Sequence, residues 1–262
     1  MIDIQHITKV FYPGTINEKV ALEDVSLTIN DGDVICVVGS NGSGKTTLFN
    51  LIGGTYSLTN GTILHNGANI SKVPEYKRAA TIGRIFQDPT KGTAASMSIE
   101  DNMILASSKG MKGLKISLNN EMRKKFSKML EPIGLQDRLK DNVGLLSGGQ
   151  RQALTLLMAV MSHPSLILLD EHTAALDPRN ADIVMELTES YINQENLSAM
   201  MITHNMQFAI DYGNRLIMMD EGRIIIDVSG EEKKKLTVEK LVSMFQTIRK
   251  KEFANDEGLL NV

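Results

Sequence analysis

The sequence lacks several features that would place it in a narrow class. It has one cysteine, and no apolar run approaches the roughly 18 residues that cross a bilayer. A single cysteine cannot form an internal disulfide, which excludes a disulfide-stapled secreted domain and favours a reducing compartment. The N-terminus, MIDIQHITKVF, carries an early acid and alternates apolar with polar residues, which excludes a secretory signal. A basic excess is also missing: the net charge of −3 and the pI near 6.0 argue against a general nucleic-acid binder.

Short strand-like segments dominate the first part of the chain. IDIQHI and VSLTI alternate apolar and polar residues, as half-buried strands do. VICVV is a continuous apolar run, as expected of a central strand that is covered on both sides. Cys36 lies in this run and is predicted to be a buried small hydrophobe. The pair Asn66-Gly67, flanked by apolar residues, predicts a hairpin turn.

The pattern changes at about Thr93. SIEDNMILAS and LNNEMRKKFSKMLEPIGL have helical spacing and predict an inserted helical subdomain. Strands and helices then alternate: SLILLD and LSAMMITH are predicted strands on either side of the helix RNADIVMELTESYI, and NRLIMMDEGRIIIDV is predicted to form two strands joined at Asp220-Glu221-Gly222. This alternation predicts an α/β domain with a mostly parallel sheet. The last segment, from EEKKKLTVEKLVSMF, is predicted to be a helix with a solvated lysine run and a frayed, charged end.

The stretch VVGSNGSGKTTLF contains a complete phosphate-binding motif. GSNGSGKT fits G-x-x-x-x-G-K-[ST], and it follows an apolar strand and precedes a helix-like run, which is the context that the motif requires. A glycine-rich turn with a coincidental lysine is the alternative. Backbone N–H groups and the helix N-terminus would hold a phosphate, Lys45 would reach the β- and γ-phosphates, and the Thr46 hydroxyl would bind Mg²⁺. The residues predicted to bind the nucleotide here are Ser40, Asn41, Gly42, Ser43, Gly44, Lys45, Thr46 and Thr47.

Two acids follow the strand in LILLDEHTAALDP. Asp170 ends the predicted strand, where the second metal-orienting acid of a phosphate-loop NTPase belongs. Glu171 is one residue further on, in position to orient or deprotonate a water that attacks the γ-phosphate. His204 follows the strand AMMIT and is predicted to donate a hydrogen bond to the same phosphate. Without a phosphate loop, these residues would be interpreted as a solvated turn and a structural cap.

A second glycine pair, in VGLLSGGQRQAL, raises the question of why one chain needs two phosphate loops. Together GSNGSGKTT, IFQDP, LSGGQ, LILLDE, AALD and His204 resemble, in order and spacing, the nucleotide-binding domain of ABC (ATP-binding cassette) ATPases. The resemblance implies a phosphate-loop NTPase core of the RecA-like kind, with an N-terminal antiparallel β-subdomain and a helical subdomain inserted at about residues 93–160. The ATPase domain would span residues 1–228, followed by a C-terminal helix and tail over 229–262.

The same resemblance implies a function for the second loop. In this family two cassettes pack head to tail, and the second loop of one subunit closes over the ATP held by the first loop of the other. Gln87 would contact the metal or the lytic water. Phe11 would stack on adenine, and the neighbouring Tyr12 is a second candidate for this contact. The alternative role for Phe11 is that of a core aromatic at the end of a strand. The residues implied to act across the dimer are Ser147, Gly148, Gly149, Gln150 and, at the seam, Asp177. The catalytic group would be Glu171, His204 and Gln87, and the metal ligands Thr46, Gln87 and Asp170.

The chain departs from the family pattern at two places. Asp170-Glu171 is usually followed by proline, and here by His172; we interpret this as a simple replacement, with a catalytic imidazole as the alternative. The stretch QRQALTLLMAVM lacks the arginines that are common after the second loop. It stays apolar and helical, so its packing should be kept.

The resemblance implies a cytoplasmic, peripheral ATPase subunit that binds ATP and Mg²⁺ and drives a separate membrane permease. A homodimer is favoured because both motif sets are complete. The segments FYPGTINEKVAL and DEHTAALDP look most like a bacterial uptake subgroup that works with an extracytoplasmic substrate-binding protein and a branched-chain-amino-acid-type permease. An amino acid or similar small solute is the predicted cargo, and no nucleic-acid partner is expected. The alternative is an ABC ATPase acting on ribosomes or DNA; a phosphate-loop kinase or GTPase is disfavoured by LSGGQ and by the missing N-K-x-D motif.

Overall fold

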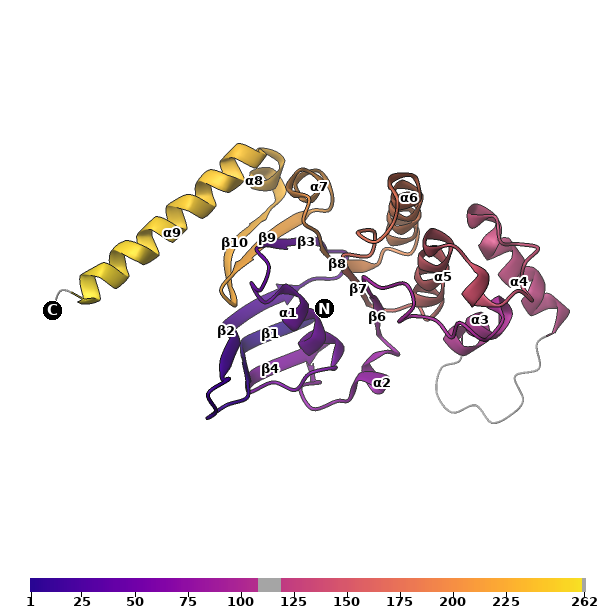
Figure 1. The fold of residues 1–262 in the computed structure, drawn as a ribbon, viewed down its shortest axis with the longest axis horizontal. Helices are drawn as coiled ribbons and strands as arrows, with labels where there is room; N and C mark the ends of the chain where they lie inside the picture. Colours follow the sequence, from indigo (N-terminus) through magenta and orange to yellow (C-terminus); the bar gives the residue numbers. More distant parts are fainter. Residues whose placement is uncertain (108–118, 261–262) are drawn as a thin grey trace. The chain divides into compact units, whose positions relative to one another are not determined.

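The computed structural model describes residues 1–107 and 119–260, and the side chains as far as Lys250. The chain forms two compact units: Met1–Lys72 with Met200–Val262, and Val73–Ala199. Figure 1 labels most of the helices and strands of both units. The predicted boundary at residue 228 separates an ATPase domain from a C-terminal helix and tail. It does not coincide with a boundary between the two units, and it stays a prediction.

The first unit contains an antiparallel sheet that confirms the predicted N-terminal β-subdomain. Its strand order is β2-β1-β4-β5, and neighbouring strands run antiparallel. The hairpin between β4 and β5 turns at Asn66 and Gly67, whose φ angles of 49° and 78° are those of a type I′ turn, as the sequence predicts. The strands are β1 (Ile2–Phe11), β2 (Lys19–Ile29), β4 (Asn60–His65) and β5 (Ala68–Asn69).

The same unit holds a second, mixed group of strands in the order β10-β9-β3-β8. β3 and β9 are parallel, whereas β10 returns antiparallel to β9 through the predicted turn at Asp220–Gly222. The elements are β3 (Val34–Gly39), α1 (Lys45–Gly53), β8 (Ser198–Ile202, which begins in the second unit), α7 (Met206–Asp211), β9 (Arg215–Asp220), β10 (Arg223–Ser229), α8 (Gly230–Lys234) and α9 (Val238–Leu260).

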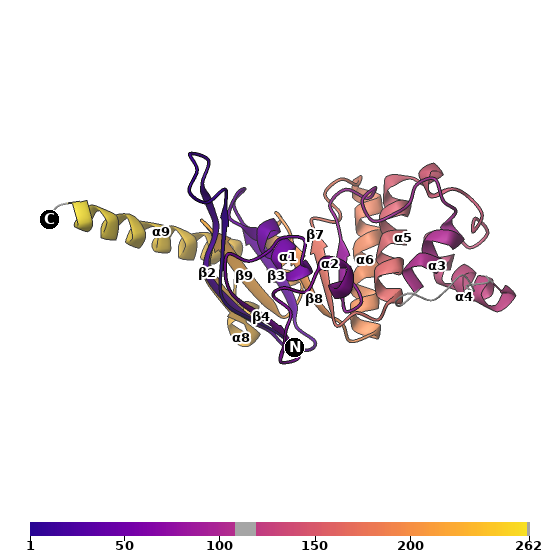
Figure 2. The same ribbon diagram turned by 90° about the horizontal axis from the view of Figure 1, so that it is seen from below.

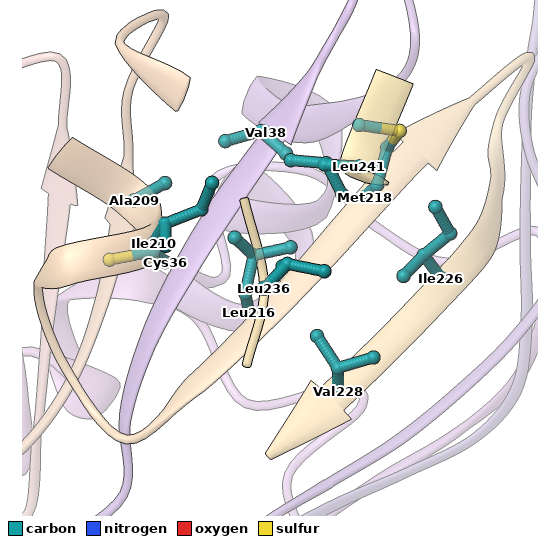
Figure 3. Close-up of a cluster of buried hydrophobic side chains, with 10 residues drawn as sticks. All are labelled: Cys36, Val38, Ala209, Ile210, Leu216, Met218, Ile226, Val228, Leu236 and Leu241. Carbon is teal, nitrogen blue, oxygen red and sulfur yellow. The ribbon is translucent and has the colours of Figure 1, made fainter. Parts of the chain in front are cut away.

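The core of this unit lies where β3, β9 and β10 meet α7 and the C-terminal segment (Figure 3). Cys36 is fully buried there, and its burial raises the pKa of the thiol to about 12. The prediction of a buried small hydrophobe is therefore confirmed. The methionines of the predicted strands are also buried core residues; they are Met200, Met201, Met218 and Met219.

The C-terminal segment differs from its prediction in two respects. The charged end that the sequence predicts to fray continues as helix α9 to Leu260. Within the lysine run, Lys233 is 4% exposed and its ammonium donates hydrogen bonds to the carbonyl oxygens of Ile210 and Tyr212 at the end of α7. Burial lowers the pKa of Lys233. The solvated-face interpretation is wrong for this residue, because a lysine stem can lie along apolar surface while its head binds the carbonyls that end a helix.

The second unit combines a parallel strand pair with a layer of helices. β6 and β7 pair in parallel, and every residue of β7 is buried, as predicted for SLILLD. Helices α5 and α6 run side by side (Figure 2). The elements are α2 (Glu75–Arg78), β6 (Ile82–Ile85), α3 (Ile99–Ser107), α4 (Asn120–Leu130), the 3-10 turns η1 (Glu131–Ile133) and η2 (Val143–Leu145), α5 (Gly148–Met161), β7 (Leu166–Asp170) and α6 (Pro178–Gln194).

The predicted helical subdomain is confirmed in its described part by α3, α4 and α5. Their apolar faces share one buried cluster, which includes Met103, Phe126 and Leu157. Residues 108–118 of the predicted segment lie outside the described residues. Strand β6 was not among the predicted elements, because IGRI is short and carries an arginine and a glycine.

Candidate functional site

The predicted phosphate loop lies in the first unit between β3 and α1. Helix α1 begins at Lys45, its N-cap Gly44 supplies no side chain, and its first turn contains no acidic residue. The first N–H groups of a helix have no partner within the helix, and they attract anions. The backbone before α1 is therefore suited to a phosphate group, as the sequence predicts.

Gly44 is required at this point by both conformation and space. Its φ is 102°, which residues with a Cβ rarely adopt. A Cβ would also lie 2.8 Å from the carbonyl oxygen of Ala21 and 2.6 Å from a methyl group of Leu22. The glycine thus lets the loop pack directly on strand β2.

Lys45 is held inside the loop. The side chain is buried, and its ammonium donates hydrogen bonds of 2.8 Å to the carbonyl oxygens of both Gly39 and Ser40. The structure therefore holds the positive charge of Lys45 at the start of the loop, bound to two carbonyl oxygens of the loop backbone. Thr46 follows on α1 and is exposed.

His204 occupies the turn between β8 and α7. It follows the end of β8 at Ile202, as predicted, and it is exposed. The next residue, Asn205, caps α7 by accepting a hydrogen bond from the N–H of Phe208. The N-cap of α7 is therefore Asn205, and His204 is not needed to cap this helix.

Phe11 ends strand β1, and its ring forms a T-shaped pair with the ring of Tyr56. The two ring centroids lie 5.3 Å apart at 84°, and the ammonium of Lys9 lies 5.0 Å from the Phe11 centroid. Phe11 is half-buried, whereas Tyr12 is 67% exposed. The ring of Phe11 is thus oriented by its neighbours, which favours it over Tyr12 as a stacking surface.

In the second unit, Asp170 and Glu171 have different environments. Asp170 is the last residue of β7 and is 8% exposed, and the guanidinium of Arg84 lies 3.6 Å from its carboxylate. Glu171 has a φ of 47°, a strained value for a residue with a Cβ, and its carboxylate accepts a 3.1 Å hydrogen bond from the amide of Gln87. The structure therefore brings two of the predicted catalytic residues, Gln87 and Glu171, into direct contact.

Arg84 is a residue that the sequence analysis missed. It lies on β6, and its guanidinium is 4.6 Å from the Phe86 ring centroid as well as close to Asp170. A buried carboxylate needs a counter-charge, and Arg84 supplies one. The only signal in the sequence was a charged residue inside the apolar segment IGRIF.

The second glycine loop forms the start of helix α5. Ser147 is its N-cap, and a complete capping box joins Ser147 and Gln150 through two hydrogen bonds of 3.2 Å. The Ser147 oxygen accepts from the Gln150 N–H, so the hydroxyl hydrogen can still be donated to a ligand. A Ser hydroxyl at a helix N-terminus is suited to an anion, which agrees with the predicted phosphate contact.

The two glycines of this loop have different roles. A Cβ on Gly149 would lie 2.6 Å from the side chain of Asn180 on α6, whereas a Cβ on Gly148 would meet only Leu176, at an ordinary 3.6 Å. Gly149 is therefore required by the close approach of α5 and α6. Gly148 meets no such close neighbour, and the phosphate contacts of both glycines stay predictions.

Asp177 caps the neighbouring helix α6. Its carboxylate accepts hydrogen bonds from the side chain and the backbone of Asn180, which together lower its pKa. Asp177, Asn180 and Gln150 line a cavity of about 480 Å³ between α5, α6 and η1. The predicted seam residue is thus positioned beside the second loop within this unit.

Comparison with known proteins decides the family. Residues 22–174 match the family model of the ABC transporter. The chain is 40% identical to the tyrosine transport ATP-binding protein of Clostridioides difficile over 94% of its length and 99% of the relative. It is also 33% identical to the methionine import ATP-binding protein MetN of Corynebacterium efficiens over 86% of its length and 61% of the relative.

The chain belongs to the ABC transporter family. Among solved structures, the cassette resembles an ATP-binding cassette of an ABC transporter in its ADP conformation, with a TM-score of 0.74, 28% identity, and coverage of 94% of this chain and 98% of the other. It also resembles the dimeric post-hydrolysis state of a cassette bound to ADP and phosphate, with a TM-score of 0.72, 25% identity, and coverage of 87% and 98%. The cassette is an ATPase of this family.

His172, where the family pattern has proline, is a core residue of this cassette. It is 2% exposed, and burial lowers its pKa to about 4. Its Nε2 lies 3.2 Å from the Thr188 hydroxyl, which itself donates to the carbonyl oxygen of Val184 at 2.7 Å. Because that hydroxyl hydrogen is already used, Nε2 of His172 must be the donor. The lowered pKa makes the ring neutral at pH 7. This environment supports a structural replacement over a catalytic imidazole.

Proposed function

We propose that this cassette is the ATP-hydrolysing subunit of a transporter that imports an amino acid or a similar small solute. The observation that carries the proposal is the 40% identity to a tyrosine transport ATP-binding protein along nearly the whole of both chains. Relatives named for methionine and hemin import are about a third identical to it over the aligned residues. Among the helices of residues 1–107 and 119–260, none has an apolar stretch long enough to cross a bilayer.

Several of the predicted site residues have a role that their local geometry supports. Lys45 and the first N–H groups of α1 bind the phosphates of ATP. Glu171 accepts a proton from the attacking water. Gln87 donates a hydrogen bond to the Glu171 carboxylate and so orients this carboxylate. His204, exposed beyond the end of β8, donates a hydrogen bond to the γ-phosphate. Phe11 stacks on the adenine.

Mg²⁺ fits the chemistry of the donors. Thr46, Gln87 and Asp170 offer a hydroxyl, an amide oxygen and a carboxylate, which are the hard oxygen ligands that Mg²⁺ prefers. No cluster of three His, Cys, Asp or Glu suited to a metal occurs in the described part of the chain. A site with few protein ligands is typical of Mg²⁺ bound with nucleotide phosphates. When bound, the ion would neutralise charge on the phosphates.

We further propose that two copies of the cassette share their nucleotides. Ser147, Gly148, Gly149 and Gln150 of one copy contact the ATP held by the phosphate loop of the other, and Asp177 lies at the seam. The free hydroxyl hydrogen of Ser147 and the N-terminus of α5 support this role. Gly149 contributes by allowing α5 to approach α6. A dimeric cassette among the structural relatives also supports the proposal.

ATP-driven closure of the dimer would act on a separate membrane permease at the cytoplasmic face of the membrane. An extracytoplasmic substrate-binding protein would deliver the solute. Purification of the complex from membranes, followed by identification of its subunits, tests this part of the proposal. Recovery of the cassette with ribosomes or DNA and with no membrane protein would contradict it.

The hydrolytic role is tested by Glu171→Gln. The amide cannot accept the proton of the attacking water, so turnover should fall by at least about a hundredfold while ATP binding is kept. Gel filtration with ATP should show an accumulated dimer. Glu189→Gln, at an exposed position of α6, makes the same chemical change and should behave like the wild type. Normal turnover in the Glu171 variant would remove this residue from the mechanism.

The shared site is tested by mixing two inactive variants. Lys45→Ala removes the phosphate contact of the first loop, and Ser147→Arg blocks the second. A mixed dimer contains one site with both loops intact, so mixing should restore part of the activity. Confirmed mixed dimers with no activity would contradict sharing between copies.

A further inference from the structure

A buried carboxylate lies against the phosphate loop in the first unit. Asp220 ends strand β9 and is 4% exposed, and its Oδ1 accepts a 3.2 Å hydrogen bond from the hydroxyl of Ser40. Two residues further on, the N–H of Gly222 donates a 3.1 Å hydrogen bond to the carbonyl oxygen of Ser43. The turn between β9 and β10 is therefore attached to the loop at both of these serines.

The charge of this carboxylate is balanced by the C-terminal helix. Nε of Arg249, on α9, lies 2.6 Å from Oδ2 of Asp220, and its Nη1 lies 3.0 Å from the carboxylate of Glu221. The Arg249 side chain is 32% exposed, and the ring of Phe245, one helical turn earlier, lies 5.6 Å from the guanidinium. The same helix is anchored in the core by Leu241, which is fully buried.

The position of this ion pair gives it an electrostatic consequence. A phosphate loop binds polyanions, and an unbalanced negative charge one hydrogen bond away would oppose them. Because Asp220 is buried, solvent screens its charge only weakly. Arg249 neutralises that charge and also fixes the Oδ1 that orients Ser40.

We propose that Arg249 is a positioning residue for the nucleotide site, acting through Asp220 on Ser40 of the phosphate loop. The proposal rests on the proposed nucleotide-binding role of that loop. The proposal gives helix α9 a role in ATP binding, although the helix is remote in sequence from the phosphate loop. The ion pair joins the helix to the loop, so loss of Arg249 weakens nucleotide binding while leaving the catalytic residues of the second unit in place.

The test is a set of charge variants, with the dissociation constant of a fluorescent ATP analogue as the readout. Arg249→Gln should weaken binding about tenfold, because the buried charge of Asp220 is no longer balanced. Lys250→Gln removes the same charge from the next, exposed position of α9 and should leave affinity within about twofold of the wild type. Asp220→Asn keeps an oxygen for Ser40 and should bind at least as well as the wild type.

The double variant Asp220→Asn/Arg249→Gln separates electrostatics from folding. With both charges removed, affinity should return to within about threefold of the wild type. In ATPase assays, Arg249→Gln should raise KM and leave kcat nearly unchanged. If Arg249→Gln binds as tightly as Lys250→Gln, or if the double variant binds as weakly as Arg249→Gln, the inference is wrong. Lys45→Ala tests the loop itself: unchanged affinity in that variant would reject the proposed phosphate site rather than the role of Arg249.

Discussion

Replacing His172 by glutamine tests whether this histidine belongs to the core or to the reaction. The neutral ring donates from Nε2 to Thr188, and a glutamine side chain can supply an N–H donor in the same region. Glutamine does not titrate, so the variant removes one proton-binding group and keeps a donor. ATPase activity at pH 8 should stay within about threefold of the wild type, since the ring takes no part in the mechanism.

The pH dependence of stability gives the sharper measurement. Burial lowers the pKa of His172 to about 4, from an ordinary value of about 6.5. The unfolded chain therefore binds the proton more tightly than the folded chain, so the folded state loses stability as the pH falls from about 6.5 towards 4. At pH 5 the two values correspond to a loss of about 2 kcal/mol relative to pH 8, and above about pH 7 the effect vanishes.

The assay is urea unfolding at pH 8 and pH 5 for the wild type and for His172→Gln. Other acid-sensitive groups are common to both proteins, so the change in unfolding free energy between the two pH values should be smaller in the variant by about 2 kcal/mol. His163→Gln, at a residue whose side chain is 68% exposed, should keep the wild-type difference. Equal pH dependence in the wild type and His172→Gln would refute the argument from burial.

Three further predictions concern the two loops and the adenine contact. Gly149→Ala should destabilise the protein by about 1–3 kcal/mol, because the new Cβ meets Asn180 on α6. Gly148→Ala should change the unfolding free energy by less than about 1 kcal/mol. Equal effects of the two substitutions in urea unfolding would contradict the packing. Phe11→Ala should weaken ATP binding more than Tyr12→Ala in a fluorescence titration, and the reverse order would assign the stacking ring to Tyr12. Lys45→Ala should lower nucleotide affinity itself, and unchanged binding would contradict its contact with the phosphates.

Much of the site was predictable because its motifs are local. The phosphate loop requires glycines, a lysine and a hydroxyl within eight residues, between a strand and a helix, and the structure has those elements around Gly39–Thr46. The capping box at Ser147 is likewise defined by residues three apart. Such features are set by backbone geometry over one turn, so the sequence pattern and the structure agree.

Residues whose roles depend on distant partners could not be predicted in this way. Lys233 looks like part of a solvated run, but it is buried against the end of α7. Gly149 is predicted to bind a phosphate, and the close approach of Asn180 is a second reason for its missing side chain that the local pattern does not show. In each case the decisive neighbour is remote in sequence, and no local pattern reports it.

By itself, the sequence determined the family, the order of strands and helices, and the chemical types of the site residues, because each follows from short patterns of polarity and spacing. Only the tertiary structure decided which charges are balanced: Arg84 against Asp170, and Arg249 against Asp220. The physical reason is burial. A carboxylate removed from water needs a counter-charge within a few ångströms, and folding alone determines which arginine lies there.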